Sequence, residues 1–197
     1  MEAFFVSTGV VALAEIGDKT QLLAFLLAAR FKKPLPIVAG ILCATVINHG
    51  LAGALGAWAT TQISPDVMRW LLGLSFLAMA AWTLVPDKLD ENDAHIATRW
   101  GVFGATFTTF FLAEMGDKTQ IATVALAAHY SAAQLGAWAV VAGTTLGMLI
   151  ADVPAVFIGQ QFANRIPMKL VRAVAASVFA LMGLFTLLRG ERMFAMF

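Results

Sequence analysis

Long apolar runs, separated by short polar or proline-containing breaks, make up most of the chain. The runs that are long enough to cross a bilayer as helices cover about 3–30, 36–60, 67–86, 100–129, 134–160 and 168–189. Only the break at 87–99 has any length, and its cluster of charged residues is typical of a solvated linker. The pattern predicts an all-α membrane protein with six transmembrane helices.

The second half of the chain repeats the first. The octapeptide at 14–21 returns 99 residues later at 113–120, and 14–29 agrees with 113–128 at 10 of 16 positions. At an offset of 103, further matches are Gly40 with Gly143, Gly56 with Gly159, Phe76 with Phe179, Met79 with Met182 and Thr83-Leu84 with Thr186-Leu187. We therefore predict two three-helix repeats, 1–86 and 100–197, joined by a cytoplasmic linker at 87–99. Because each repeat has an odd number of spans, the second repeat must be inverted, a design that recurs in secondary transporters.

The loop charges predict the same topology independently, because Lys and Arg accumulate on the cytoplasmic side of a membrane protein. The first, third and fifth loops with their helix ends hold Arg30, Lys32, Lys33, Lys88, Arg99, Arg165, Lys169 and Arg172, and the other face holds Arg69, Arg189 and Arg192. This distribution predicts that both termini are periplasmic in an inner-membrane protein.

Composition narrows the class of function. Of the 197 residues 60% are apolar and 13% are charged, against about 25% charged in soluble domains. The net charge of +1, without a basic tract, gives no reason to expect a nucleic-acid partner. The single cysteine excludes an intramolecular disulfide, and no space is left for a soluble catalytic domain. We expect a protein that is not an enzyme and whose surroundings are the lipid bilayer.

Each copy of the repeated octapeptide places three charges inside an apolar run. They are Glu15, Asp18 and Lys19 in the first copy and Glu114, Asp117 and Lys118 in the second. A charged side chain at mid-span costs roughly 2.5 to 3.5 kcal/mol on insertion scales, while a Leu contributes only about 0.3 to 0.6 kcal/mol. Such charges mark a functional site, where they meet one another or a ligand.

On a continuous helix the charged residues of each motif fall within an arc of about 100°, with Gln21 and Gln120 flanking the aspartates. Thr20 and Thr119 lie off that arc, and their hydroxyls suit a cation or the backbone of their own helix equally well. Two roles are open for the glycines at 17 and 116: close approach of two helices, or a local break that offers carbonyl groups to an ion.

If the two motifs face each other, four acids and two lysines give a formal charge of 4 × (−1) + 2 × (+1) = −2. One divalent cation or two protons would neutralise this site, which is the minimal requirement for an antiporter. We expect Lys19 and Lys118 to balance charge by pairing with acids. A scaffold whose charges only form structural ion pairs is the alternative from another class.

Carboxylate and amide oxygens, without thiolates, suit hard cations such as Mn²⁺, Ca²⁺ or Mg²⁺. Asp152, a further acid within an apolar run, and Asn48 are predicted to add oxygen ligands. We interpret His49 as an interhelical hydrogen-bond partner, and Gly143, Gly147 and Gly56 as small residues for helix packing.

The paired segments Glu15-Ile16-Gly17-Asp18-Lys19-Thr20 and Glu114-Met115-Gly116-Asp117-Lys118-Thr119 resemble the E-x-G-D-[KR]-[TS] signature of a family of Golgi, chloroplast and bacterial Mn²⁺/Ca²⁺ transporters. The resemblance covers the whole chain. It implies cation/proton exchange, with Glu15, Asp18, Glu114 and Asp117 in the metal site. It further implies a bacterial manganese exporter of the inner membrane.

We therefore expect a secondary transporter that exports Mn²⁺ in exchange for protons, with the metal as substrate and no cofactor. The predicted ligands are Glu15, Asp18, Gln21, Glu114, Asp117, Gln120, Asp152 and Asn48, with Thr20 and Thr119 as possible hydroxyl ligands. Ca²⁺/H⁺ exchange and export of a small organic cation are the alternatives within transport. An intramembrane hydrolase with a carboxylate dyad is disfavoured, because the adjoining lysines favour ionisation of both acids.

Overall fold

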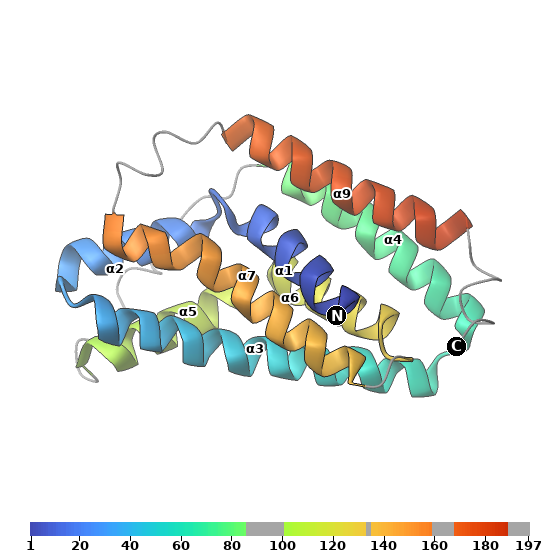
Figure 1. Ribbon diagram of the computed structural model, residues 1–197, viewed down its shortest axis with the longest axis horizontal. Coiled ribbons are helices and arrows are strands. Elements are labelled where there is room, and N and C mark those ends of the chain that lie inside the picture. Colours follow the sequence, from blue (N-terminus) through green and yellow to red (C-terminus); the bar gives the residue numbers. More distant parts are fainter. Residues whose placement is uncertain (86–100, 133–134, 159–167, 189–197) are drawn as a thin grey trace.

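The computed structural model describes residues 1–85, 101–132, 135–158 and 168–188, and all regular structure among them is helical (Figure 1). The helices are α1 (Glu2–Glu15), α2 (Lys19–Phe31), α3 (Pro34–Gln62), α4 (Pro65–Thr83), α5 (Gly101–Glu114), α6 (Lys118–His129), α7 (Gly136–Ile158) and α9 (Met168–Leu188). The predicted linker at 87–99 lies outside the described residues, as do the outermost residues predicted for the last three helices. The all-α class is confirmed.

Two of the predicted spans are not continuous helices, so that part of the prediction is wrong. The run at 3–30 is divided into α1 and α2, and the run at 100–129 is divided into α5 and α6. At the centre of each break a glycine has a positive φ, +82° at Gly17 and +77° at Gly116, which L side chains rarely adopt. Of the two roles left open for these glycines, the structure shows the helix break.

Each long helix packs against the broken helix of the other half of the chain. Gly40 on α3 faces α5, where a Cβ on that glycine would lie 2.8 Å from Thr106 Cβ. Gly147 on α7 faces α1, where a Cβ would lie 2.7 Å from the Thr8 carbonyl oxygen. These close approaches confirm that the small residues of α7 serve helix packing.

The helices α4 and α9 form a pair at one side of the molecule (Figure 1). Gly183 on α9 lies against α4, since a Cβ there would be 2.8 Å from the Gly73 carbonyl oxygen. Phe76 of α4 and Phe179 of α9, which occupy equivalent positions of the two repeats, are both fully buried. The pair meets the rest of the bundle through α1 and α6.

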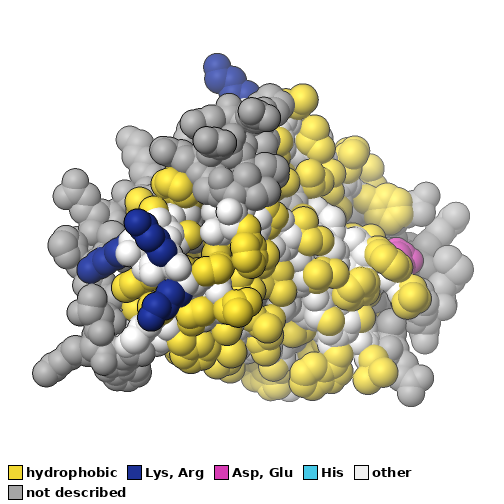
Figure 2. All heavy atoms as spheres, turned by 60° about the vertical axis from the view of Figure 1, so that its left-hand side comes forward, with side chains coloured by type: hydrophobic (Ala, Val, Ile, Leu, Met, Phe, Trp, Pro, Cys, Tyr) yellow, Lys and Arg dark blue, Asp and Glu magenta, His cyan; other side chains and the backbone are white. Residues whose placement is uncertain are grey.

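The surface has the character of a membrane protein. Within the described residues, three helices are apolar enough by length and composition to cross a bilayer: α3, α7 over Gly136–Phe157 and α9 over Lys169–Leu188. Figure 2 shows hydrophobic side chains spread over the centre and right of one face, with most of the visible Lys and Arg side chains at its left. Such a contiguous apolar surface is rare on a soluble monomer and indicates contact with lipid.

We predict that Gly116→Ala destabilises the protein, because an alanine with this positive φ is strained by roughly 1 to 2 kcal/mol. A Cβ at Gly116 would meet no neighbour within 4 Å, so the backbone conformation alone is tested. Gly50→Ala is the matched control: it also has no neighbour within 4 Å, but it lies inside α3 and should be neutral or stabilising. Thermal unfolding in detergent should show a lower midpoint for Gly116→Ala only, and equal midpoints would contradict the strain at the break.

Candidate cation site

The two breaks bring the charged residues of the motifs together in the interior. Glu15 and Glu114 are the last residues of α1 and α5, and Asp18 and Asp117 are the N-cap residues of α2 and α6. All four acids are buried, with at most 3% of their surface exposed. The prediction of one helical arc for each motif is wrong, because the helix ends between its Glu and its Asp.

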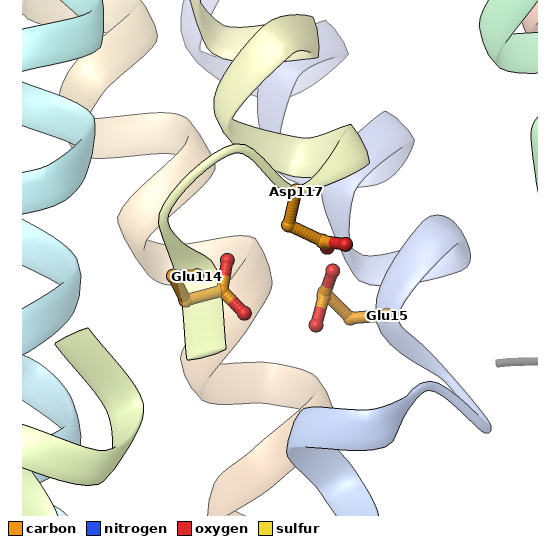
Figure 3. Close-up of side chains that lie close together, drawn as sticks. All are labelled: Glu15, Glu114 and Asp117. Atoms are coloured by element: carbon orange, nitrogen blue, oxygen red, sulfur yellow. The ribbon is translucent and has the colours of Figure 1, made fainter. Parts of the chain in front are cut away.

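Three of these carboxylates converge on one point. Each of Glu15, Glu114 and Asp117 offers an oxygen, and these oxygens lie within 4.8 Å of one another (Figure 3). Glu15 comes from the first half of the chain and the other two acids from the second half. We call Glu15, Glu114 and Asp117 the carboxylate cluster. It is the only group of three or more potential metal-ligating acids, histidines or cysteines among the described residues.

A threonine hydroxyl orients each glutamate of the carboxylate cluster. Thr20 Oγ1 donates a hydrogen bond of 2.6 Å to Glu15 Oε2, and Thr119 Oγ1 donates one of 2.8 Å to Glu114 Oε2. The second oxygen of each carboxylate, Oε1, is buried and has no hydrogen-bond partner among the described residues. Each threonine hydroxyl therefore binds one oxygen of its glutamate carboxylate, and the other oxygen, Oε1, could bind a ligand.

The two lysines pair with aspartates of the opposite motif. Lys19 Nζ lies 3.2 Å from Asp117 Oδ1, and Lys118 Nζ forms the corresponding ion pair with Asp18. Each lysine thus lies against an acid, and its role in balancing the charge of the site stays a prediction. Because each pair joins the first half of the chain to the second, the motifs are linked reciprocally.

The motif glutamines stabilise the breaks. Gln21 Oε1 accepts a hydrogen bond of 2.9 Å from the Gly17 N–H, and Gln120 Oε1 accepts one of 2.7 Å from the Gly116 N–H. Gln21 Nε2 also donates to the Ala151 carbonyl oxygen at 2.9 Å. These amide oxygens lie at the glycines and outside the carboxylate cluster, although each keeps a second lone pair for a ligand.

Two other predicted ligands lie on the long helices, outside the carboxylate cluster. Asp152 on α7 is fully buried, and neither of its carboxylate oxygens has a hydrogen-bond partner among the described residues. Asn48 on α3 donates from Nδ2 to the Phe111 carbonyl oxygen at 3.1 Å and keeps its buried Oδ1 without a described partner. The predicted hydrogen bond of His49 is not seen, since neither ring nitrogen has a partner in the described part of the chain.

Main-chain groups complete the surroundings of the site in ways that sequence reasoning missed. The carbonyl groups of Ala151 and Phe111 hold Gln21 and Asn48 across the interface between the halves. No side-chain signal identifies these two carbonyls, because both residues are apolar. Their positions, next to Asp152 and three residues before Glu114, are the only indication that the sequence contains.

This arrangement is suited to a hard cation. Carboxylate oxygens are the ligands that Mn²⁺, Ca²⁺ and Mg²⁺ prefer. A buried carboxylate oxygen that has no hydrogen-bond partner is stabilised when it binds a cation or a proton. A helical bundle with an apolar surface and such a site in its interior belongs to the membrane transport proteins for cations.

The comparisons with known proteins identify the family. The model of the divalent cation/proton antiporter GDT1 family matches residues 3–91 and again 102–194, one copy in each half of the chain. The chain therefore belongs to this family of membrane transporters. A Vibrio cholerae protein named "Putative manganese exporter" is 53% identical over 186 residues, which cover 94% of this chain and 90% of that protein.

More distant relatives match over a similar length. GDT1-like protein sll0615 of Synechocystis is 31% identical over 92% of this chain and 94% of its own length. GDT1-like protein 5 of Arabidopsis thaliana is 25% identical over 95% of this chain and 96% of its own length. No solved structure matches the chain.

We predict that Thr20→Val weakens Mn²⁺ binding by roughly ten- to a hundredfold, because a hydrogen bond to a charged group contributes about 1.5 to 3 kcal/mol. Valine has the shape of threonine but leaves Glu15 Oε2 without its donor. Thr20→Ser keeps a hydroxyl and should bind the metal nearly like the wild type. Isothermal titration in detergent measures both variants, and equal affinities of the valine and serine variants would rule out this orienting role.

Proposed function

We propose that this protein exports Mn²⁺ from a bacterial cytoplasm across the inner membrane in exchange for protons. The observation that carries the proposal is the carboxylate cluster, in which oxygens of Glu15, Glu114 and Asp117 from both halves converge in the interior. Membership of a divalent cation/proton antiporter family supports the ion class and the exchange. The name of the Vibrio relative supports manganese as the substrate and export as the direction.

The charges of the site explain why exchange rather than uniport fits it. Among the motif residues, Lys19 and Lys118 balance Asp117 and Asp18, so Glu15 and Glu114 leave a formal charge of −2, not counting Asp152. One Mn²⁺ or two protons neutralise that charge, whereas the empty site is costly to expose to the interior of the bilayer. Occupancy by metal and by protons is mutually exclusive because both use the same glutamate oxygens.

We further propose that the remaining predicted donors complete the coordination as the metal enters or leaves the carboxylate cluster. These donors are Asp18, Asp152, Gln21, Gln120 and Asn48, with Thr20 and Thr119 as hydroxyl donors. The oxygens of Asp152 and the Oδ1 of Asn48 support this role, since both are buried without described partners.

The six-span inverted repeat, with repeats 1–86 and 100–197 and periplasmic termini, belongs to the same proposal. The reciprocal packing of the two halves supports this topology: α3 packs on α5, and its repeat equivalent α7 packs on α1. The ion pairs show the same reciprocity, because the lysine of each motif contacts the aspartate of the other motif. Exchange of the two halves then provides access from either side.

Ca²⁺ is the second candidate substrate. A site made of carboxylate oxygens also suits Ca²⁺, and oxygen ligands alone discriminate weakly between these two ions. Competition between the ions for transport separates the possibilities.

We predict that Glu114→Gln and Asp117→Asn each reduce Mn²⁺ uptake into pH-gradient proteoliposomes by more than tenfold, because each removes a charge from the carboxylate cluster. Glu2→Gln is the matched control, since Glu2 is an exposed acid at the start of α1 whose described contact is with Tyr130. Wild-type transport by Glu114→Gln would overturn the site. Transport of Ca²⁺ but not Mn²⁺ by the wild type would overturn the choice of metal.

We predict that alkaline phosphatase is active when fused after Gln62 and inactive when fused after Lys33. Lys33 lies directly before α3 and Gln62 is its last residue, so the proposed topology places these two ends of α3 on opposite sides of the membrane. The enzyme requires an oxidising periplasm to form its disulfides. Green fluorescent protein at the same two positions should give the reverse pattern. The opposite result for both reporters would reverse the proposed orientation.

A further inference from the structure

Two arginines occupy equivalent positions in the two repeats. Arg69 lies near the start of α4 and Arg172 near the start of α9, at the offset of 103 that also relates Phe76 to Phe179. An inverted repeat places these arginines toward opposite faces of the membrane. A site built of two equivalent halves would give them equivalent surroundings in a symmetric packing.

Their surroundings differ. Arg172 Nη2 donates to the carbonyl oxygen of Gly17, at the centre of the first break, over 3.4 Å. The guanidinium of Arg69 instead lies over the ring of Trp70, 5.8 Å from its centroid. Its buried Nε has no hydrogen-bond partner among the described residues. One arginine therefore holds a break of the opposite half, and the other does not.

The helices that carry the arginines show the same difference. The helix α9 packs on α1, which leads into the first break, whereas α4 packs on α6, which follows the second break. Gly17 is half-buried, but the second break is open to the surface: Gly116 is exposed and Met115 is 57% exposed. Since both glycines have nearly the same φ, the breaks themselves are alike and only their covering differs.

We propose that Arg172 and Arg69 are alternating latches, each of which holds the break of the opposite half in one of two packings of the transporter. In the packing described here, Arg172 binds the Gly17 carbonyl and the second break is open. In the exchanged packing Arg69 binds the Gly116 carbonyl and the first break is open. This inference rests on the inverted repeat of the proposed function.

The chemistry of the contact suits a latch. Gly17 lies between the C-cap of α1, Ile16, and the N-cap of α2, Asp18, so its carbonyl group belongs to neither helix and can accept a hydrogen bond from outside the break. A guanidinium is always charged and offers five N–H donors, so it can satisfy such a carbonyl without any change of protonation. A hydrogen bond that forms in only one of two packings stabilises that packing over the other by the whole free energy of the bond.

The test uses a cysteine reporter at each break. Cys43 is replaced by alanine, and Ile16→Cys or Met115→Cys is introduced at the equivalent positions before the two glycines. The rate of alkylation by N-ethylmaleimide in detergent reports how open each break is. Each arginine is replaced by alanine in turn. The alkylation rate is then measured at the break that this arginine does not bind in the proposal. Removing the arginine side chain does not directly expose the cysteine at that distant break.

Arg172→Ala removes the bond of the described packing, so alkylation of the cysteine at 115 should slow. Arg69→Ala removes the bond of the exchanged packing, so alkylation of the cysteine at 16 should slow. A hydrogen bond from a charged donor changes the ratio of the two packings by about tenfold. Arg172→Lys keeps a charged donor and should restore most of the wild-type rate.

Lys169→Ala is the matched control, because Lys169 is exposed one turn before Arg172 on α9. It should change neither rate. Unchanged rates at both remote cysteines, or faster alkylation at both, would overturn the latches, since a merely structural role loosens the fold everywhere. The alkylation rates do not depend on transport, so a wild type that fails to transport Mn²⁺ would refute the proposed function and leave this result interpretable.

Discussion

The cost of placing charge inside a membrane is the constraint on which the rest of this structure depends. Asp18 and Asp117 are buried with a lysine ammonium against each of them, and each lysine comes from the opposite half of the chain. Either half alone would leave two acids and a lysine in an apolar surrounding. The reciprocal pairs therefore make the two halves mutually dependent, and they fix the place where the breaks meet.

The other residues of the motif follow from the same requirement. A break in a buried helix leaves N–H and carbonyl groups without partners, and Gln21 and Gln120 satisfy the N–H groups of the two central glycines. Thr20 and Thr119 use the first turn of the next helix to reach back to the glutamates. Within each motif, the lysine balances the charge of an acid, the glutamine satisfies the N–H group at the break, and the threonine orients the glutamate.

Hydropathy and the internal repeat were sufficient to predict an all-helical membrane protein and to single out the motif acids that meet in its interior. They could not decide between a break and close helix packing at Gly17 and Gly116, because a glycine within an apolar run is compatible with either. The assumption of a continuous helix then gave one arc for each motif, although Glu15 and Asp18 lie on different helices. The crossed pairing of Lys19 and Lys118 depends on how the halves pack, which the repeat within one chain does not specify.

Identical motifs do not make a symmetric site. Asp117 joins Glu15 and Glu114 in the carboxylate cluster, while its equivalent Asp18 lies outside the cluster in the more deeply buried ion pair, with Lys118. The asymmetry follows the packing of the outer helices, since α9 meets α1 whereas α4 meets α6. In the described packing the cluster takes two acids, Glu114 and Asp117, from the second half of the chain and Glu15 from the first half. In the proposed alternative packing, a cation would instead face two acids of the first half and one acid of the second half. In the proposed exchange of packings, the choice of aspartate is tied to the choice of packing, which is the coupling between occupancy and access that an exchanger needs.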